Sequence, residues 1–298
     1  MTKTAFVTIA GRTNAGKSSL LNSIIGEKIA SVSDKPQTTR TRITGIKTIG
    51  ETQLVFFDTP GLHKPKNKLS EHMLNTVKES VCGIDAVVFV MDCTKKINSQ
   101  ETEFLKSFSE SGMPVILVLN KIDLLDDKSK LAPIIAELTS EIKFHAVIPV
   151  SVTENNGIDI VESEIMKLAS ESPHHFPDDK FTDQPEKVLA SEMIREKLLI
   201  LLKDEVPHGI AVGIETMEER QDKDILDISA VIYCERNSHK GIIIGKGGSM
   251  LKKASSMARA ELEDFFQIHV NLQCWVKVKE DWRNKEGLIK NFGLADDK

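Results

Sequence analysis

Cysteine is scarce in this chain, and the few that occur form no pattern that binds a metal or builds a disulfide framework. The 298 residues include Cys82, Cys93, Cys234 and Cys274, which lie far apart and form no C-x-x-C pair. Such spacing argues against a zinc site and against a secreted, disulfide-stapled fold. We therefore expect a protein of a reducing cytoplasm.

The chain also lacks a long apolar run, a net positive charge, an internal repeat and a low-complexity tract. No stretch approaches the ~20 apolar residues that a membrane span needs. The net charge is −5 and the isoelectric point is near 6.0, so any nucleic-acid site must be a local basic patch. A length of 298 residues with 40% apolar and 28% charged residues indicates a globular protein of two domains.

Short apolar runs alternate with helical patterns over the first 170 residues or so. Continuous apolar runs of this kind are typical of a mostly parallel sheet with helices on both faces. Ligands of such α/β sheets lie at the carboxyl ends of the strands. The expected strands are 5–10, 43–49, 54–57, 86–91, 115–119 and 147–150, and the expected helices are 69–80, 100–109, 131–141 and 158–169.

A phosphate-loop motif directly follows the first expected strand. Gly11 to Ser18 read G-R-T-N-A-G-K-S, which fits G-x-x-x-x-G-K-S. Gly11 and Gly16 let backbone N–H groups point inward around a di- or triphosphate. Lys17 would reach the β- and γ-phosphates, the Ser18 hydroxyl would bind Mg²⁺, and the following helix N-terminus favours an anion.

Further motifs follow later strands and complete a guanine nucleotide site. Asp58 of D-T-P-G can hold Mg²⁺ through a water, and the Gly61 N–H can reach a γ-phosphate. Asn120 to Asp123 read N-K-I-D, where the Asp123 carboxylate can accept two hydrogen bonds from guanine, and adenine offers no such pair of donors.

Four residues are expected to support the nucleotide further. Asn120 can bond the base or brace the phosphate loop, and the Lys121 stem can pack on the base. Ser151 is placed to donate its backbone N–H to guanine O6. In the polar segment 31–42, Thr39 can donate its N–H to the γ-phosphate and its hydroxyl to Mg²⁺, which would order the loop only when triphosphate is bound.

A polar, proline-punctuated stretch around residues 170–185 reads as a linker, and a second domain begins near Val188. Its element order is α-β-β-α-α-β. Gly245-Lys246-Gly247-Gly248 forms a G-x-x-G loop after an apolar run and before a helix, where glycines let a nucleic-acid backbone approach closely. Residues 236–260 include no Asp or Glu but several basic residues, among them Arg236, Lys240, Lys246, Lys252 and Lys253.

The motifs together resemble the Era family of the TrmE-Era branch of GTPases, and the resemblance covers nearly the whole chain. It rests on the phosphate loop, Thr38-Thr39-Arg40, Asp58 to Gly61, Asn120 to Asp123 and the G-x-x-G loop, which looks like a type II KH domain. The resemblance implies an α/β P-loop GTPase domain at 1–172, a linker at 173–187 and an α+β type II KH domain at 188–298. It implies a cytoplasmic, monomeric GTPase that binds near the 3′ end of small-subunit ribosomal RNA and assists maturation of the small ribosomal subunit. Peripheral association with the inner face of the cell membrane stays open.

The family also implies a set of ligands. GTP or GDP would be held by Gly11, Asn14, Ala15, Gly16, Lys17, Ser18, Ser19, Asp58, Gly61, Asn120, Lys121, Asp123, Ser151 and Val152, with Mg²⁺ on Ser18, Thr39 and Asp58. Leu62 stands where Ras-like enzymes carry a glutamine that orients water, so the family implies K⁺ near Asn14 instead. Lys17, Thr39, Gly61 and Asn14 would then be the catalytic residues. Thr13 and Val152 depart from the family's usual proline and alanine.

Two other interpretations remain open on the residues alone. The nucleotide could be a structural ligand of an RNA-binding or scaffolding protein with negligible turnover, which Leu62 favours. Alternatively, the KH-like domain could bind a protein, although its acid-free loop and helix argue against this.

Overall fold

The computed structural model describes residues 1–35, 38–61, 67–79, 83–292 and 294, in which the chain divides into two compact units. The first unit comprises Met1–Ala30, Thr39–Lys64 and Met73–Asp183. The second comprises Ser31–Thr38, Pro65–His72 and Gln184–Lys298. The two short segments therefore group with the second unit, although their chain neighbours belong to the first.

The sheet of the first unit has seven strands among the described residues, and most of them run parallel. Its order is β2-β3-β1-β4-β5-β6, in which β2 pairs antiparallel with β3, and a short β7 pairs antiparallel with β1. The strands are β1 (Lys3–Gly11), β2 (Ile43–Ile49), β3 (Thr52–Asp58), β4 (Ala86–Asp92), β5 (Val115–Asn120), β6 (Ala146–Val150) and β7 (Ser170–Glu171). Every residue of β4 and β5 is buried, as continuous apolar runs in the middle of a parallel sheet require.

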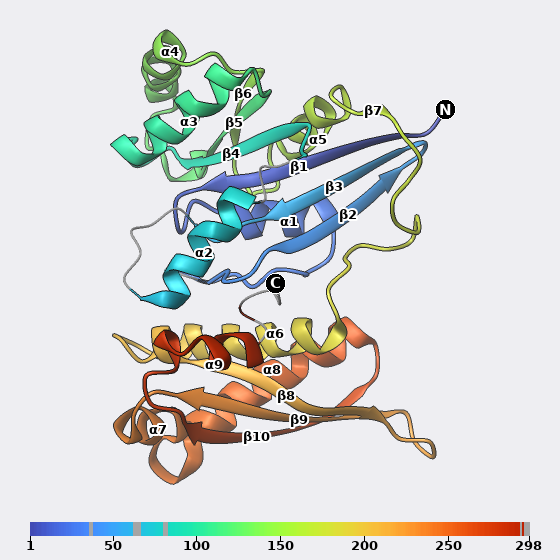
Figure 1. Cartoon of the computed structure of the whole chain (residues 1–298), viewed down its shortest axis with the longest axis vertical. Coiled ribbons are helices and arrows are strands. Elements are labelled where there is room, and N and C mark those ends of the chain that lie inside the picture. The colour runs from blue at the N-terminus through green and yellow to red at the C-terminus, as the bar shows by residue number, and fades with distance from the viewer. Residues whose placement is uncertain (36–37, 62–66, 80–82, 293, 295–298) are drawn as a thin grey trace. The chain divides into compact units, whose positions relative to one another are not determined.

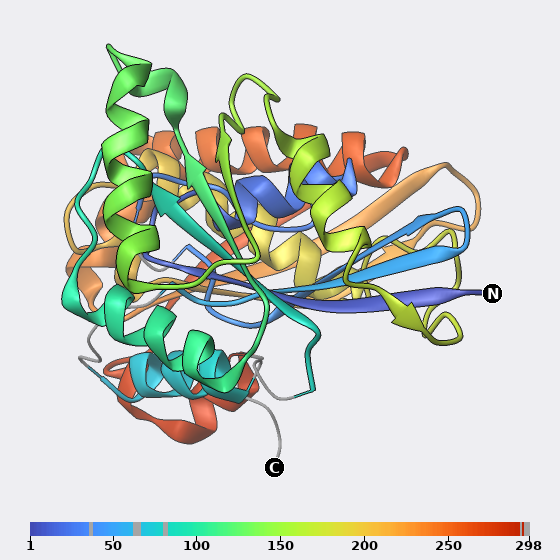
Figure 2. The same cartoon turned by 90° about the horizontal axis from the view of Figure 1, so that it is seen from above.

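Helices cover both faces of this sheet. Residues of α3 and α4 pack with β4 and β5 in one hydrophobic cluster, whereas α1 and α5 contact each other against β1 and β3. Figure 2 shows α1 and α5 side by side, away from α3 and α4. The helices are α1 (Lys17–Ile25), α3 (Ser99–Ser111), α4 (Leu131–Glu141) and α5 (Ile158–Met166), and α2 (Lys68–Glu79) begins in a segment of the second unit.

The second unit has the expected α-β-β-α-α-β order, with a short helix added after it (Figure 1). Its sheet order is β10-β9-β8, with β8 antiparallel and β10 parallel to β9. Apolar side chains of α6 and α8 form one core with the central strand β9. The elements are α6 (Glu186–Leu201), β8 (Ala211–Glu219), β9 (Ile225–Cys234), α7 (Asn237–Ile244), α8 (Ser249–Phe266), β10 (His269–Val278) and α9 (Glu286–Asn291).

Much of the stretch that reads as a linker is bonded to the first unit's sheet. The Gln53 side chain is fully buried, accepts the N–H groups of His175 (2.8 Å) and Phe176 (3.0 Å), and donates to the Phe176 carbonyl (2.9 Å). Further along, the Thr182 hydroxyl donates to the Thr44 carbonyl (2.7 Å). The segment thus lies along the sheet, and the domain bounds at 172 and 188 stay a prediction.

In the described part of the chain, no helix has both the length and the apolar character that crossing a membrane demands.

We expect Gln53→Ala to destabilise the first unit by about 2 kcal/mol, because it removes the hydrogen bonds that the buried Gln53 side chain makes to the backbone of residues 175 and 176. Gln100→Ala, at an exposed position of α3, is the matched control and should change stability by less than about 0.5 kcal/mol. Urea denaturation followed by circular dichroism measures both. Equal stability of the two variants would mean that the segment is not held by Gln53.

Candidate functional sites

The carboxyl ends of neighbouring parallel strands bring the phosphate-loop and base-binding motifs to one edge of the first sheet. In the pairing register, Ile9 of β1 lies opposite Asp58, and Gly11 lies opposite Val90. Asn120 of β5 lies opposite Asp92 on one side and Val150 on the other. Motifs that are far apart in the sequence therefore follow adjacent strands.

Close packing and positive φ angles make glycine necessary at two positions of the phosphate loop. Gly11 has φ 141°, and a Cβ there would lie 2.2 Å from the Val90 carbonyl oxygen. Gly16 has φ 102°, and a Cβ there would lie 2.2 Å from Nδ2 of Asn120. L-residues rarely adopt either φ, so the loop requires glycine at both positions.

The loop leads into α1, which is free of acidic residues in its first turn. Ala15 is buried in the loop, and Ser18 and Ser19 lie in that first turn. The helix N-terminus therefore offers backbone N–H groups and a partial positive charge to an anion, with no carboxylate competing for them.

Two opposite charges are buried beside the loop. Lys17 is only 6% exposed, and its Nζ donates to the Arg12 carbonyl (3.1 Å). Burial lowers the pKa of Lys17, whereas the nearby charge of Asp58 acts to raise it. Burial likewise raises the pKa of Asp58, against the opposing effects of Lys17, Ser18 and Thr39. Phosphate oxygens next to Lys17 and a cation next to Asp58 would each favour the charged form of their partner.

Side-chain oxygens of three predicted Mg²⁺ ligands converge around Asp58. Ser18 Oγ donates to Asp58 Oδ2 (2.7 Å), and Thr39 Oγ1 lies 2.8 Å from Ser18 Oγ and 3.4 Å from Asp58 Oδ2. Asp58 Oδ1 is buried and has no hydrogen-bond partner in the described residues. Hydroxyl and carboxylate oxygens are the ligands that Mg²⁺ prefers, so these residues fit the ion.

The other residues expected near the γ-phosphate lie in tight backbone positions. A Cβ on Gly61 would lie 2.6 Å from Cγ2 and 2.8 Å from the backbone of Thr13, so Gly61 abuts the phosphate loop. Asn14 adopts the left-handed conformation with φ 63°. Leu62 lies outside the described residues.

Asn120 and Lys121 both hold the phosphate loop, one by its amide and the other by its ammonium group. Asn120 is 3% exposed, donates to the Ala15 carbonyl (2.8 Å) and accepts from the Val152 N–H (3.3 Å). Lys121 Nζ donates to the Asn14 carbonyl (2.8 Å). Of the two roles expected for Asn120, the structure shows the bracing of the phosphate loop.

The predicted donation from the Ser151 N–H to guanine O6 does not fit the structure. That N–H donates to the Asn156 carbonyl (3.1 Å) within a tight turn. The Ser151 hydroxyl instead donates to Asp123 Oδ1 (2.7 Å) and so orients the carboxylate expected to read the base.

In the second unit, the G-x-x-G loop joins α7 to α8 with three glycines in conformations that L-residues rarely adopt. Gly245, Gly247 and Gly248 have φ values of 74°, 61° and 79°. A Cβ on Gly245 would lie 2.7 Å from Cβ of Met250, whereas Gly247 and Gly248 face open space. The first glycine is needed for packing, and the other two leave the backbone accessible.

The basic residues around this loop are largely open to solvent. Arg236, Lys246, Lys252 and Lys253 are exposed, and Lys240 is half-buried. No carboxylate lies in the first turn of α8, and Ile242 is 49% exposed just before the loop. Positive side chains, an accessible backbone and an apolar residue thus lie close together in the sequence of this loop region, as a nucleic-acid strand would require.

Two family models match this chain, one in each half. A family model described as 50S ribosome-binding GTPase matches residues 6–121, and a KH domain model matches residues 205–283. The GTPase Era of Clostridioides difficile (strain 630) is 50% identical over 296 residues, which cover 99% of this chain and 100% of that protein. This chain belongs to the GTPase Era family. The GTPase Era of Ruminiclostridium cellulolyticum is 47% identical over 99% of both chains.

Solved Era structures match the whole chain as well. Era in complex with MgGDPNP and nucleotides 1506–1542 of 16S ribosomal RNA has a TM-score of 0.95 at 36% identity, covering 99% of this chain and 100% of that one. A variant of Aquifex aeolicus Era bound to GDP and aluminium fluoride has a TM-score of 0.94 at 35% identity, with the same coverage. This Era-family protein is a GTPase, with a P-loop GTPase domain followed by a KH domain.

Asp92, at the end of β4, is a site residue that the sequence motifs did not indicate. The residue is 7% exposed. Its carboxylate accepts Lys121 Nζ (2.9 Å) and the Thr94 N–H (3.1 Å). Burial alone would raise the pKa of Asp92, but hydrogen bonds from Thr94 and Lys121 hold it at about 2. A carboxylate directly after a buried strand, as at Asp58, is the signal that could have found it.

We expect Asp123→Asn to weaken GTP binding by more than about tenfold in this Era-family GTPase and to favour xanthine nucleotides, because the C2 oxygen of xanthine needs a donor. Asp126→Asn, at an exposed position three residues on, is the matched control. Competition binding with GTP and xanthosine triphosphate measures the effect. An unchanged GTP affinity of Asp123→Asn would remove the assignment.

Proposed function

We propose that this Era-family GTPase binds single-stranded RNA near the 3′ end of small-subunit ribosomal RNA and assists maturation of the small ribosomal subunit, with bound GTP or GDP as the switch. The observation that supports RNA binding is the G-x-x-G loop. Its backbone is open at Gly247 and Gly248, and the helix that follows has no acidic residue in its first turn. The Era structure bound to nucleotides 1506–1542 of 16S ribosomal RNA supports the choice of RNA.

In the nucleotide site, we assign the phosphates to the loop Gly11–Ser18 and the base to residues 120–123 and 151–152. Lys17 would lie beside the β- and γ-phosphates, and Ser18, Thr39 and Asp58 would hold Mg²⁺. When bound, Mg²⁺ neutralises charge that develops on the phosphates. The N–H groups of Thr39 and Gly61 would orient the γ-phosphate.

We further propose that the protein acts as a monomer in the cytoplasm, with peripheral contact at the inner face of the cell membrane as an open alternative. The four widely spaced cysteines, which form no C-x-x-C pair, support the cytoplasmic location.

Potassium should accelerate GTP hydrolysis more than sodium does, because an apolar Leu62 cannot orient water and Asn14 matches the family's ion ligand. Asn14→Ala should abolish this difference while leaving GDP affinity unchanged. Since Asn14 has φ 63°, Asn14→Gly is the control that loses the side chain without backbone strain, and it should behave the same. Phosphate release in the two salts at equal ionic strength measures the effect, and equal rates for the unmodified protein would contradict it.

Replacing Lys246 and Gly247 with Asp should largely abolish RNA binding, because two carboxylates would face the RNA backbone. RNA affinity of the unmodified protein should fall with salt at a slope of roughly −0.7 per neutralised phosphate. Lys223→Asp with Gln221→Asp, in the exposed turn between β8 and β9, makes the same change of net charge and is the matched control. Filter binding of a small-subunit RNA 3′ oligonucleotide measures both. Equal affinity of the two double variants would remove the loop assignment, and RNA-free GTP hydrolysis should survive in both.

A further inference from the structure

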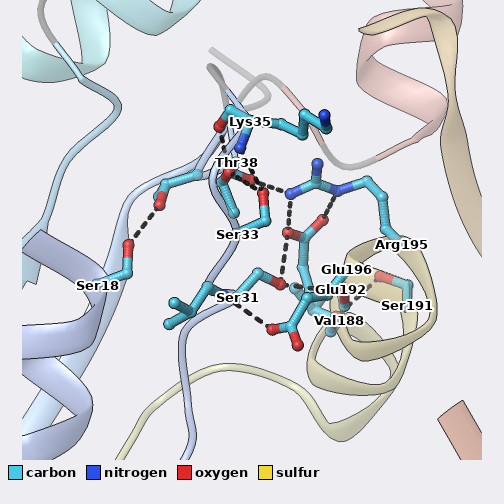
Figure 3. A network of polar contacts seen from close by, with 12 residues as sticks. Ser18, Ser31, Ser33, Lys35, Thr38, Val188, Ser191, Glu192, Arg195 and Glu196 are labelled. Carbon is cyan, nitrogen blue, oxygen red and sulfur yellow. Dashed lines mark hydrogen bonds and ion pairs between the residues drawn. The ribbon is translucent and has the colours of Figure 1, made fainter. Parts of the chain in front are cut away.

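The loop that leads to Thr39 changes unit at the peptide bond between Thr38 and Thr39. Segment Ser31–Thr38 belongs to the second compact unit, together with α6, whereas Thr39 belongs to the first. Figure 3 shows the side chains of α6 that contact this segment. Thr39, the predicted γ-phosphate ligand, therefore directly follows Thr38, whose carbonyl is bonded by a side chain of α6.

Polar groups of α6 hold the segment at both of its ends. Near its start, Ser31 Oγ donates to the Glu192 carbonyl (3.0 Å), and the Val32 N–H donates to Glu196 Oε2 (2.8 Å). At its end, Nη2 of Arg195 donates to the Thr38 carbonyl. The Thr38 hydroxyl also donates to the Lys35 carbonyl (2.7 Å), which closes the segment on itself (Figure 3).

Arg195 is a buried charge with few degrees of freedom. It is 1% exposed, and Nε donates to Glu192 Oε1 (2.8 Å) while Nη2 also contacts Glu192 Oε2. A carboxylate that binds the guanidinium through both oxygens fixes its plane. Its Nη1 is buried and has no hydrogen-bond partner in the described residues. Burial of an arginine is costly unless its charge is paired, and Arg195 uses its Glu192 pairing to present Nη2 to a backbone carbonyl.

The contacted carbonyl controls the direction of the Thr39 N–H. The two groups belong to the same planar peptide unit, in which C=O and N–H point in opposite directions. A donor that holds the Thr38 oxygen on one side therefore sets where the Thr39 hydrogen points on the other. A hydrogen bond to the carbonyl also polarises the peptide and strengthens its N–H as a donor.

We propose that Arg195 is a positioning residue for GTP: it holds the Thr38–Thr39 peptide so that the Thr39 N–H faces the γ-phosphate. This inference rests on the proposed role of Thr39. GDP has no γ-phosphate, so Arg195 affects binding of the triphosphate and its hydrolysis, and leaves GDP binding unchanged.

The test compares Arg195→Met, Arg195→Lys and a control, Arg220→Met, which removes the arginine of a half-exposed ion pair with Asp227 in the same unit. The measurements are the affinities for Mg·GDP and for a non-hydrolysable Mg·GTP analogue, kcat for GTP hydrolysis, and the melting temperature. Arg195→Met should lower both the analogue affinity and kcat by on the order of tenfold, with GDP affinity within about twofold. Arg195→Lys keeps a charged donor and should recover part of the loss, and Arg220→Met should match the unmodified protein.

A purely structural role predicts a different pattern. In that case both nucleotide affinities would fall together with the melting temperature, and this result, or no change in either affinity, would overturn the proposal. If Arg195→Met fails to fold, Arg195→Met with Glu192→Met removes both buried charges and leaves neither unpaired. The double variant should show the same selective loss of analogue affinity, and the absence of this loss would also overturn the proposal.

Thr39→Pro separates this inference from the assignment on which it rests, because proline removes the N–H that would bind the γ-phosphate, whereas Thr39→Ala would remove only the hydroxyl. If Thr39→Pro leaves the analogue affinity unchanged, the role of the Thr39 N–H is wrong. If Thr39→Pro weakens analogue binding and Arg195→Met does not, only the inference about Arg195 fails. If both variants weaken it, Arg195→Met should cost less in the Thr39→Pro background than in the unmodified protein, because both changes act on the same N–H contact.

Discussion

The burial of two opposite charges at one edge of the sheet is the constraint on which the nucleotide site depends. Burial favours the neutral forms of both Lys17 and Asp58. A phosphate beside Lys17 and Mg²⁺ beside Asp58 would each favour the charged form of that side chain, so the ligand completes an electrostatic arrangement that folding has already prepared. The surrounding features maintain this arrangement: Gly11 and Gly16 allow the loop to pack against β4 and Asn120, and Asn120 fixes the loop through Ala15.

Thr39 links this site to the rest of the chain. Its hydroxyl lies next to Ser18 and Asp58, and its N–H belongs to a peptide group whose carbonyl accepts from Arg195. The Thr38–Thr39 peptide bond thus joins a residue of the first unit to a residue that α6 bonds within the second unit. Apolar side chains of α6 are part of the second unit's core, and we propose this loop as the route by which a γ-phosphate at Thr39 affects that unit.

Local patterns were enough to predict the strands, the helices and the motifs at the strand ends, because a phosphate loop or an N-K-x-D turn is a short run of residues. Two features depend on partners far along the chain, and no local pattern reveals them. Gln53 bonds residues 175 and 176, so a polar, proline-containing stretch lies along the sheet. Arg195 contacts Thr38, but a charged residue in a helical pattern reads as solvent-exposed. A third feature is local: the Ser151 N–H is bonded to the Asn156 carbonyl within a tight turn, so the Ser151 hydroxyl, not its N–H, contacts the base-site residue Asp123.

The proposed switch requires that the nucleotide state at Thr39 changes how the second domain binds RNA. To measure this coupling, the affinity of the unmodified protein for one small-subunit RNA 3′ oligonucleotide is determined first with Mg·GDP and then with a non-hydrolysable Mg·GTP analogue. We expect a coupling of about 1–3 kcal/mol, a roughly 5- to 150-fold difference in RNA affinity. Equal RNA affinity with the two nucleotides would contradict it.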